Sequence, residues 1–341
     1  MIGPRIGRML CPWLFAPLAQ LEAAAGAGRL GHGWLISGPA GIGKRNLAYV
    51  IADRLLAGAI GSPPPEPATP RGMLAANAEL ATADLHPDLH RLRAEEDKRT
   101  ISVNQVRDAT AALTLTPHLA ACKLVIIDRA DIMTPEAANA LLKSLEEPTP
   151  ATYLFLLADR PGRLPPTVLS RCQRLTLRLP PAEHVEAWLA ADGLDPAPLA
   201  LRPRPLTPLV AAQLLNDDGL FKIYIELQDS IDLVYDAKVD PHALAERWQK
   251  GDTELALSCL IERLQAEIRE RLVPGHSKLI TDRVARLTEN PPESIAADAL
   301  FAGLRLAENL REQLGRGTNV ELALKSLLLG LERSHPERMN W

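Results

Sequence analysis

The sequence predicts an α/β domain with a parallel sheet and flanking helices, followed by an all-helical remainder. Up to about residue 180, short apolar runs alternate with segments of helical periodicity, and a glycine-rich loop follows the first run. Beyond Pro180 the strand signals stop and helical periodicity dominates to the end. Strands separated by helices favour a parallel sheet, so we expect an α/β domain over residues 1–179. The helical remainder is expected to form two further regions, at 180–221 and 222–341.

The bulk composition is that of a water-soluble protein with more than one domain. Of the 341 residues, 47% are hydrophobic and 23% are charged, which excludes a disordered or fibrous chain. The net charge of -4 argues against a freestanding nucleic-acid binder. No apolar run reaches the ~18 residues of a membrane span, so we expect a cytoplasmic protein.

The first strand, loop and helix follow one another directly. Apolar residues recur at helical spacing over residues 13–30, and residues 34–36 form a short apolar run that leads into the glycines. Residues 46–56 then place apolar side chains on one helical face. This order is typical of a phosphate-binding loop.

Residues 57–84 break the pattern. They are rich in Gly, Ala and Pro, and residues 62–67 have polyproline character. We therefore predict an exposed insertion here.

The later elements have clear start signals. Ser102 with Gln105 three residues later predicts a helix start, and this helix should end before Pro117. Thr134 followed by Pro135 predicts another, which should run to about residue 147. Further strands are expected at 124–127, 153–157 and 174–179.

The glycine loop carries the first candidate site. Gly38, Gly41 and Gly43 allow the backbone to curl so that its N–H groups face a phosphate, and Lys44 can reach the outer phosphates. The next residue is Arg45, where a nucleotide hydrolase needs a Ser or Thr hydroxyl for magnesium. Whether nucleotide binds at this degenerate site stays open.

A second candidate position, Asp128, follows an apolar strand. Such strand ends gather ligands in open parallel sheets, and Asp128 could position magnesium. Its neighbour is Arg129, and a guanidinium cannot accept the proton of an attacking water. We expect Asp131 to start a turn and point away, so it does not supply the missing base.

Two segments resemble the signature of bacterial clamp-loader subunits. Residues 139–148 read NALLKSLEEP and residues 164–172 read LPPTVLSRC. The resemblance is dense over residues 12–179 and is nearest to the DNA polymerase III delta-prime family. It implies an AAA+ module, a small helical lid at 180–221 and a helical collar at 222–341.

The resemblance also implies partners. Clamp-loader motor (gamma/tau) and delta subunits would join this chain in a five-subunit ring, which opens the sliding clamp and places it on primed DNA. Polymerisation would belong to the DNA-directed DNA polymerase holoenzyme and not to this chain.

In that family the arginine of the Ser-Arg-Cys motif projects into the ATP site of the adjacent motor subunit, which assigns Arg171 as an arginine finger acting in trans. Such a cation accelerates phosphoryl transfer by about a thousandfold or more. The chain itself is expected to be inactive as an ATPase. Two alternatives stay open: an active motor subunit that relies on Lys44 and Asp128, and a nucleotide-bound structural subunit without turnover.

The sequence departs from the family pattern at two further places. Relatives commonly carry a four-cysteine zinc module after the helix that follows the phosphate loop, but residues 57–84 contain no cysteine, so zinc is not expected. His86 and His90 do not suggest a metal pair either, because the proline after His86 disfavours helical geometry. Where motor subunits sense the terminal phosphate, the sequence has Ala158, Asp159 and Arg160, a poor sensor for an anion.

Overall fold

The computed structural model describes residues 5–83, 85–95, 98–200, 206–235, 238–272, 297–314 and 319–333. The chain forms two compact units. The first comprises Met1–Leu194 and Thr207–Gln213, and the second comprises Asp195–Leu206 and Leu214–Trp341. The three-part division at residues 179 and 221 stays a prediction.

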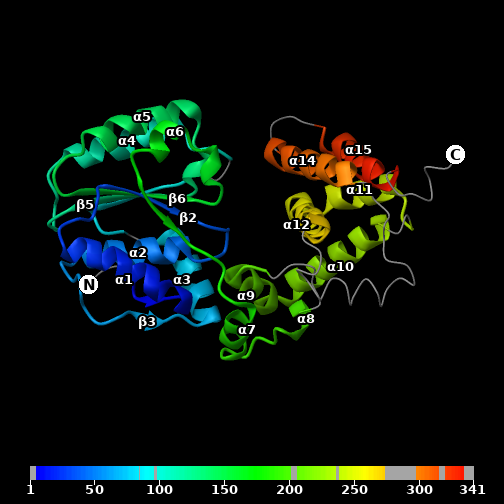
Figure 1. Cartoon of the computed structure of the whole chain (residues 1–341), viewed down its shortest axis with the longest axis horizontal. Coiled ribbons are helices and arrows are strands. Elements are labelled where there is room, and N and C mark those ends of the chain that lie inside the picture. The colour runs from blue at the N-terminus through cyan, green and yellow to red at the C-terminus, as the bar shows by residue number, and fades with distance from the viewer. Residues whose placement is uncertain are drawn as a thin grey trace. The chain divides into compact units, whose positions relative to one another are not determined.

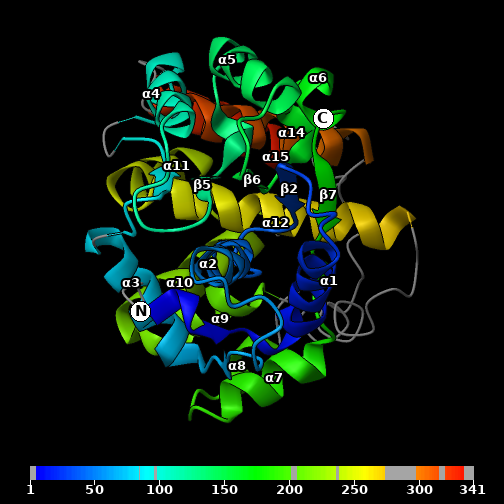
Figure 2. The ribbon, with the colours of Figure 1, turned by 90° about the vertical axis from the view of Figure 1, so that its left-hand side faces the viewer.

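A five-stranded sheet forms the centre of the first unit. The strand order is β4-β5-β6-β2-β7, all neighbours are parallel, and Figure 2 shows β5, β6, β2 and β7 in this order. The predicted parallel sheet is therefore confirmed. Its strands are β2 (Gly33–Ser37), β4 (Leu89–Leu92), β5 (Lys123–Ile127), β6 (Thr152–Ala158) and β7 (Gln173–Thr176).

Helices cover both faces of this sheet (Figure 1). Along β2, Trp34 and Ile36 pack into the core on one face, and Leu35 packs into the core on the other. Strands buried on both faces read as continuous apolar runs, which is why the sequence revealed them. The helices on one face are α1 (Phe15–Gly26), α2 (Lys44–Leu56) and α3 (Pro70–Thr82), and those on the other are α4 (Val103–Thr114), α5 (Pro135–Glu146) and α6 (Pro166–Leu169).

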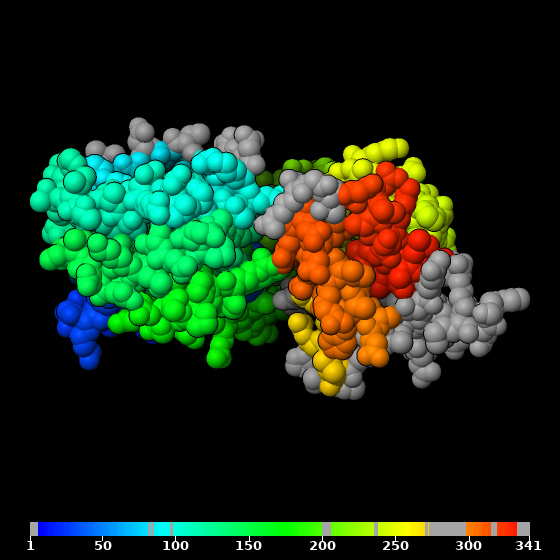
Figure 3. Space-filling model, turned by 90° about the horizontal axis from the view of Figure 1, so that it is seen from above, coloured from blue at the N-terminus to red at the C-terminus, as the bar shows by residue number. Residues whose placement is uncertain are grey.

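The predicted helix starts are confirmed. Ser102 and Gln105 form a reciprocal capping box at the start of α4. The hydroxyl of Thr134 accepts a hydrogen bond from the backbone N–H of Ala137 at the start of α5. Helices α4 and α5 pack against each other, and this face of the first unit is turned to the viewer in Figure 3.

The prediction of an exposed insertion at residues 57–84 is confirmed for residues 57–67, which are exposed or half-buried, and is wrong for the helix that follows them. Strand β3 (Glu66–Pro67) pairs with β1 (Met9–Leu10) in a second small sheet, and α3 follows. One face of α3 packs into the core of the first unit. Its buried residues are Met73, Ala76 and Leu80.

Local signals explain why α3 forms in this alanine-rich stretch. Thr69 accepts a hydrogen bond from the N–H of Gly72 as the N-cap, and Pro70 occupies the first turn, where a missing N–H costs nothing. The three buried residues recur at spacings of three and four, which is one helical face. The prolines nearby obscured this short amphipathic pattern.

Helix α7 (Ala182–Ala190) contacts three places in the N-terminal half of the first unit. The indole N–H of Trp188 donates to the carbonyl of Ala68 at 2.6 Å. The rings of Trp13 and Trp188 meet edge to face, with centroids 5.0 Å apart. Arg71 donates from its backbone N–H to the carboxylate of Asp192. Helix α7 is thereby fixed within the first unit.

The secondary structure described in the second unit consists of helices, as predicted. Helix α12 packs against α14, and α14 packs against α15; residues 273–296 of the predicted collar lie outside the described part. Within the described chain no helix is long and apolar enough to cross a membrane. The helices after α7 are α8 (Ala197–Ala200), α9 (Pro208–Asn216), α10 (Asp218–Tyr235), α11 (Pro241–Lys250), α12 (Thr253–Leu272), α14 (Ala297–Gln313) and α15 (Val320–Arg333).

A buried carboxylate, Asp88, orders the loop before β5. Its side chain is 1% exposed and accepts the backbone N–H groups of His118, Leu119 and Ala120 at 2.5, 2.8 and 2.8 Å. Burial alone would raise the pKa of Asp88, but these donors hold the pKa below its ordinary value. No group of side chains suited to a metal ion occurs among the residues the structure describes.

We expect Leu80→Ala to lower the free energy of unfolding by about 2–5 kcal/mol, because the removed side chain leaves a cavity in the core. The matched control is Leu119→Ala, since that leucine is 78% exposed and its truncation should cost less than ~0.5 kcal/mol. Urea unfolding of both variants measures the difference. Equal losses would mean that α3 does not belong to the core.

We expect Asp88→Asn to lower the free energy of unfolding by about 1–3 kcal/mol at pH 7, because buried N–H groups lose a charged acceptor. A depressed folded-state pKa gives stability above the ordinary Asp pKa of ~3.9, and this stability is lost as pH falls through the folded-state pKa. The difference from wild type should therefore shrink in acid. Urea unfolding at pH 7 and near pH 3 checks this, with the exposed Asp108→Asn as control; a pH-independent difference would contradict it.

Candidate functional site

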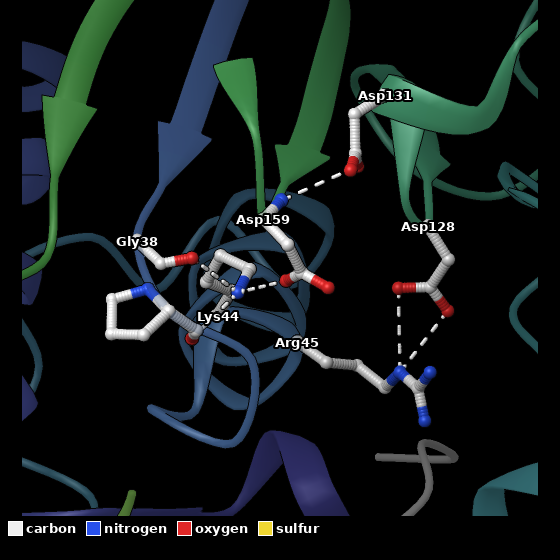
Figure 4. Close-up of polar contacts among 7 residues, drawn as sticks. Gly38, Lys44, Arg45, Asp128, Asp131 and Asp159 are labelled. Carbon is white, nitrogen blue, oxygen red and sulfur yellow. Dashed lines mark hydrogen bonds and ion pairs between the residues drawn. The ribbon is translucent and has the colours of Figure 1, made fainter. Parts of the chain in front are cut away.

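The candidate nucleotide site lies at the carboxyl ends of three neighbouring strands. The glycine loop follows β2, Asp128 follows β5 and Asp159 follows β6. Parallel strands bring their carboxyl ends to one edge of the sheet, so these groups meet although they are far apart in sequence. Figure 4 shows Lys44 and Arg45, at the start of α2, directed toward these two carboxylates.

The glycine loop requires its glycines. Gly38 has φ +153°, and a Cβ there would lie 2.7 Å from the carbonyl oxygen of Leu177. Gly43, the N-cap of α2, has φ +101°, which side chains disfavour. The carbonyl of Gly41 accepts a hydrogen bond from the N–H of Leu209 at 3.0 Å. The predicted strand, loop and helix are therefore formed.

Lys44 folds back onto its own loop. Its side chain is 8% exposed, and its Nζ donates to the carbonyls of Gly38 at 2.8 Å and Pro39 at 2.9 Å. The same nitrogen lies 2.5 Å from Oδ1 of Asp159. An ammonium has three N–H donors, and these three contacts match them. Asp159 thus balances the positive charge of Lys44, and all three N–H donors of the ammonium have acceptors within the chain.

Arg45 pairs with Asp128. Its Nε lies 3.3 Å from Oδ1 and 3.1 Å from Oδ2 of the carboxylate. Asp128 is 8% exposed, whereas Arg45 remains 44% exposed, so the aspartate meets the guanidinium at the rim of the loop (Figure 4). The carboxylate that magnesium would need is already neutralised by a cation.

The residues present do not fit a magnesium–nucleotide complex. Magnesium requires hard oxygen ligands in octahedral geometry, but the hydroxyl position is Arg45 and its guanidinium engages Asp128. A phosphate would also have to displace Asp159 from Lys44. In this structure Lys44 and Asp128 are engaged in ion pairs with side chains of the same chain.

Arg129 and Asp131 follow Asp128 closely and could affect hydrolysis. Arg129 is exposed and Asp131 is buried. Arg129 has left-handed backbone angles, φ 55° and ψ 54°. Asp131 lies in a 3-10 turn (Ala130–Ile132), but the expectation that it points away was wrong. Its Oδ1 accepts the N–H of Asp159 at 3.3 Å (Figure 4), because the turn folds back toward the end of β6.

Asp159 is the site residue that sequence reasoning missed. Its position in the sequence suggests only a poor phosphate sensor, but in the structure it provides the counter-charge of Lys44. A signal was available: Asp159 follows β6 as Asp128 follows β5, and both strand ends lie beside the glycine loop.

Arg171 lies apart from these residues, at the amino ends of the strands. It precedes β7, and a Cβ on Gly33 would lie 3.5 Å from its carbonyl oxygen. Gly33 opens the five-residue strand β2, and Gly38 follows its end. At ~3.3 Å per residue the two positions are roughly 16 Å apart. The structure therefore does not bring Arg171 together with Lys44 and Asp128.

The cysteine beside Arg171 is part of the core. Cys172 is 9% exposed, and burial raises the pKa of its thiol to about 11. A thiol with this pKa stays protonated at neutral pH and is a poor nucleophile. Its burial anchors the backbone next to Arg171.

Comparison with known proteins identifies the family. A family model described as "DNA polymerase III, delta subunit" matches residues 16–181. The DNA polymerase III subunit delta' of Pseudomonas aeruginosa is 36% identical over 250 residues, which cover 70% of each chain. The chain belongs to the DNA polymerase III subunit delta' family. The family that the two sequence signatures predicted is confirmed.

Further DNA polymerase III subunits are similar to this chain. The Escherichia coli subunit delta' is 34% identical over 215 residues, 61% of each chain. The tau subunit of Salmonella typhimurium is 28% identical over 326 residues, 92% of this chain and 48% of tau. Among solved structures, a DNA polymerase III gamma subunit-related protein from Thermotoga maritima aligns over 93% of this chain and 99% of its own, with 19% identity and a TM-score of 0.43.

We expect Arg45→Thr to bind magnesium–ATP at least about tenfold more tightly than the wild-type chain, a gain of ~1.4 kcal/mol. The variant releases Asp128 and introduces the missing hydroxyl. The matched control is Arg45→Lys, which keeps a cation opposite Asp128 and should bind as weakly as wild type. Titration with a fluorescent ATP analogue, with and without magnesium, makes the measurement. Equal affinities for all three proteins would contradict the role of the ion pair.

Proposed function

We propose that this chain is a subunit of a DNA polymerase III clamp loader that does not hydrolyse ATP itself and supplies Arg171 to the ATP site of a neighbouring motor subunit. Membership of the delta' family supports the complex. The observation that carries the division of labour is the separation of Arg171 from the glycine loop, on opposite edges of one sheet. A guanidinium in that position cannot serve the nucleotide site of its own chain.

The proposed partners follow from the family. The chain would join gamma/tau motor subunits and a delta subunit in a five-subunit ring that loads the sliding clamp onto primed DNA in the cytoplasm. The similarity to tau over 92% of this chain supports descent from a common ring subunit. Chain elongation belongs to the polymerase holoenzyme.

The ion pairs of the glycine loop support the silent role of this chain's own site. Hydrolysis needs a lysine that reaches phosphate, a carboxylate for magnesium and a base for water. Lys44 is paired with Asp159 and Asp128 is paired with Arg45, while Arg129 replaces the expected acid. We propose that this site has a structural role and that the sheet keeps the same conformation whether or not ATP is present.

The surroundings of Arg171 suit a catalytic cation supplied to a neighbour. Its backbone N–H donates to the carbonyl of Val168 at 3.1 Å, and the next residue is buried. Its side chain is 36% exposed. A guanidinium stays protonated at all relevant pH values, so it can offset charge that develops on a transferred phosphate.

The second unit is proposed to provide the collar through which the ring assembles. Two of its helices carry exposed large apolar side chains, which such an assembly contact could bury. They are Phe301 and Leu306 on α14 and Leu322 on α15, with exposed fractions of 41%, 52% and 61%.

In a reconstituted ring with clamp and primed DNA, we expect Arg171→Ala to lower ATP turnover at least about tenfold, because an arginine finger contributes ~10³ or more at its site. Lys44→Ala should leave turnover within about twofold of wild type, since a closed site contributes no hydrolysis. The matched control is Arg174→Ala, an exposed arginine three residues away. Steady-state phosphate release measures all three.

The opposite pattern would sink the proposal. Loss with Lys44→Ala but not with Arg171→Ala would restore the chain to an active motor subunit. Turnover by the purified chain alone, abolished by Asp128→Asn, would lead to the same conclusion.

A further inference from the structure

Both terminal nitrogens of Arg171 are engaged by acceptors of its own chain. Nη2 lies 2.6 Å from Oε1 of Glu146. Nη1 donates to the carbonyl of Thr167 at 3.0 Å and to the hydroxyl of Ser170 at 3.3 Å. A bidentate contact with phosphate uses parallel N–H groups of the guanidinium. In this arrangement the side chain is folded back over the turn that carries it.

Glu146 presents its carboxylate from a fixed position. It is the last residue of α5. The preceding Leu145 is buried, and its carbonyl lies 2.7 Å from Nε2 of His32. Opposite it, the turn that bears Arg171 is anchored by the buried Cys172. The residues next to Glu146 and Arg171 are therefore buried, while the side chains of the pair itself are partly exposed.

We propose that Glu146 is a positioning residue that acts as a latch, holding Arg171 in this retracted conformation until the polyphosphate of a neighbouring subunit displaces it. The inference rests on the proposed function of Arg171. A nucleotide polyphosphate carries more negative charge than one carboxylate and is itself an acceptor for a bidentate arginine, so it outcompetes Glu146 once the neighbour is seated. Before that, the arginine stays away from the reacting phosphate.

The strength of the pair suits a latch that must open. The two side chains are 36% and 49% exposed, and an exposed ion pair shifts an equilibrium by about two- to fivefold. A pair of this strength suppresses premature hydrolysis without blocking the engaged state. Its effect should also weaken as salt screens the charges.

The first test uses the isolated full-length chain and phenylglyoxal, which modifies arginine side chains. Glu146→Gln should raise the rate of modification at Arg171 by about two- to fivefold, the shift expected for an exposed pair. Glu147→Gln is the matched control, because Glu147 is exposed and adjacent, and it should leave the rate unchanged. High salt should bring wild type up to the rate of the variant.

Peptide mass spectrometry follows each arginine separately in this experiment. Arg54 is 7% exposed, and its continued protection shows that the variant is folded. An unchanged rate at Arg171 in a folded Glu146→Gln chain would overturn the latch. This test involves no partner subunit, so it fails independently of the proposed ring function.

The second test measures ATP turnover of the reconstituted ring. Without clamp and DNA, Glu146→Gln should raise turnover by about two- to fivefold, and with both present it should stay within about twofold of wild type. In an Arg171→Ala background the Glu146 substitution should have no effect, because the latch acts only through that arginine. A fall in turnover that mirrors Arg171→Ala would overturn the latch and make Glu146 an orienting residue.

Discussion

The Arg45–Asp128 ion pair is the interaction on which the account of this protein depends. It joins the first turn of α2 to the end of β5 with distances of 3.1 and 3.3 Å, at the place where a nucleotide hydrolase holds magnesium. Together with the pair of Lys44 and Asp159, it balances the charges of the glycine loop inside the chain. The groups that would face phosphate and metal in a nucleotide hydrolase are therefore paired with one another in this chain.

The parallel sheet then separates two kinds of chemistry. Its carboxyl edge holds the glycine loop with the Lys44–Asp159 and Arg45–Asp128 ion pairs, and its amino edge holds Arg171 with its partly exposed ion pair to Glu146. Because β2 and β7 run side by side between the two edges, a stiff sheet fixes the position of the arginine. On the proposed function, losing hydrolysis in this chain costs nothing, since the cation serves a neighbour's phosphate.

Features that depend on adjacent residues could be predicted from the sequence. Pairings between residues far apart in the sequence could not. The apolar runs, the Ser102 and Thr134 caps and the glycine loop are written in adjacent residues, and each formed as expected. Strand β4 was missed because His90 and Arg91 occupy its centre on a half-buried edge. Arg45 predicted a missing hydroxyl, but its pairing with Asp128 depends on strands that meet only in the fold. The pairing of Asp159 with Lys44 could not be predicted for the same reason.

The central claim is that the glycine loop is closed by internal ion pairs, and equilibrium dialysis of the isolated wild-type chain against radiolabelled magnesium–ATP tests it most directly. The account predicts no saturable binding, and the same result for Lys44→Ala and Asp128→Asn. Saturable binding by the wild-type chain that both substitutions abolish would contradict it, because Lys44 and Asp128 would then contact nucleotide and metal rather than Asp159 and Arg45.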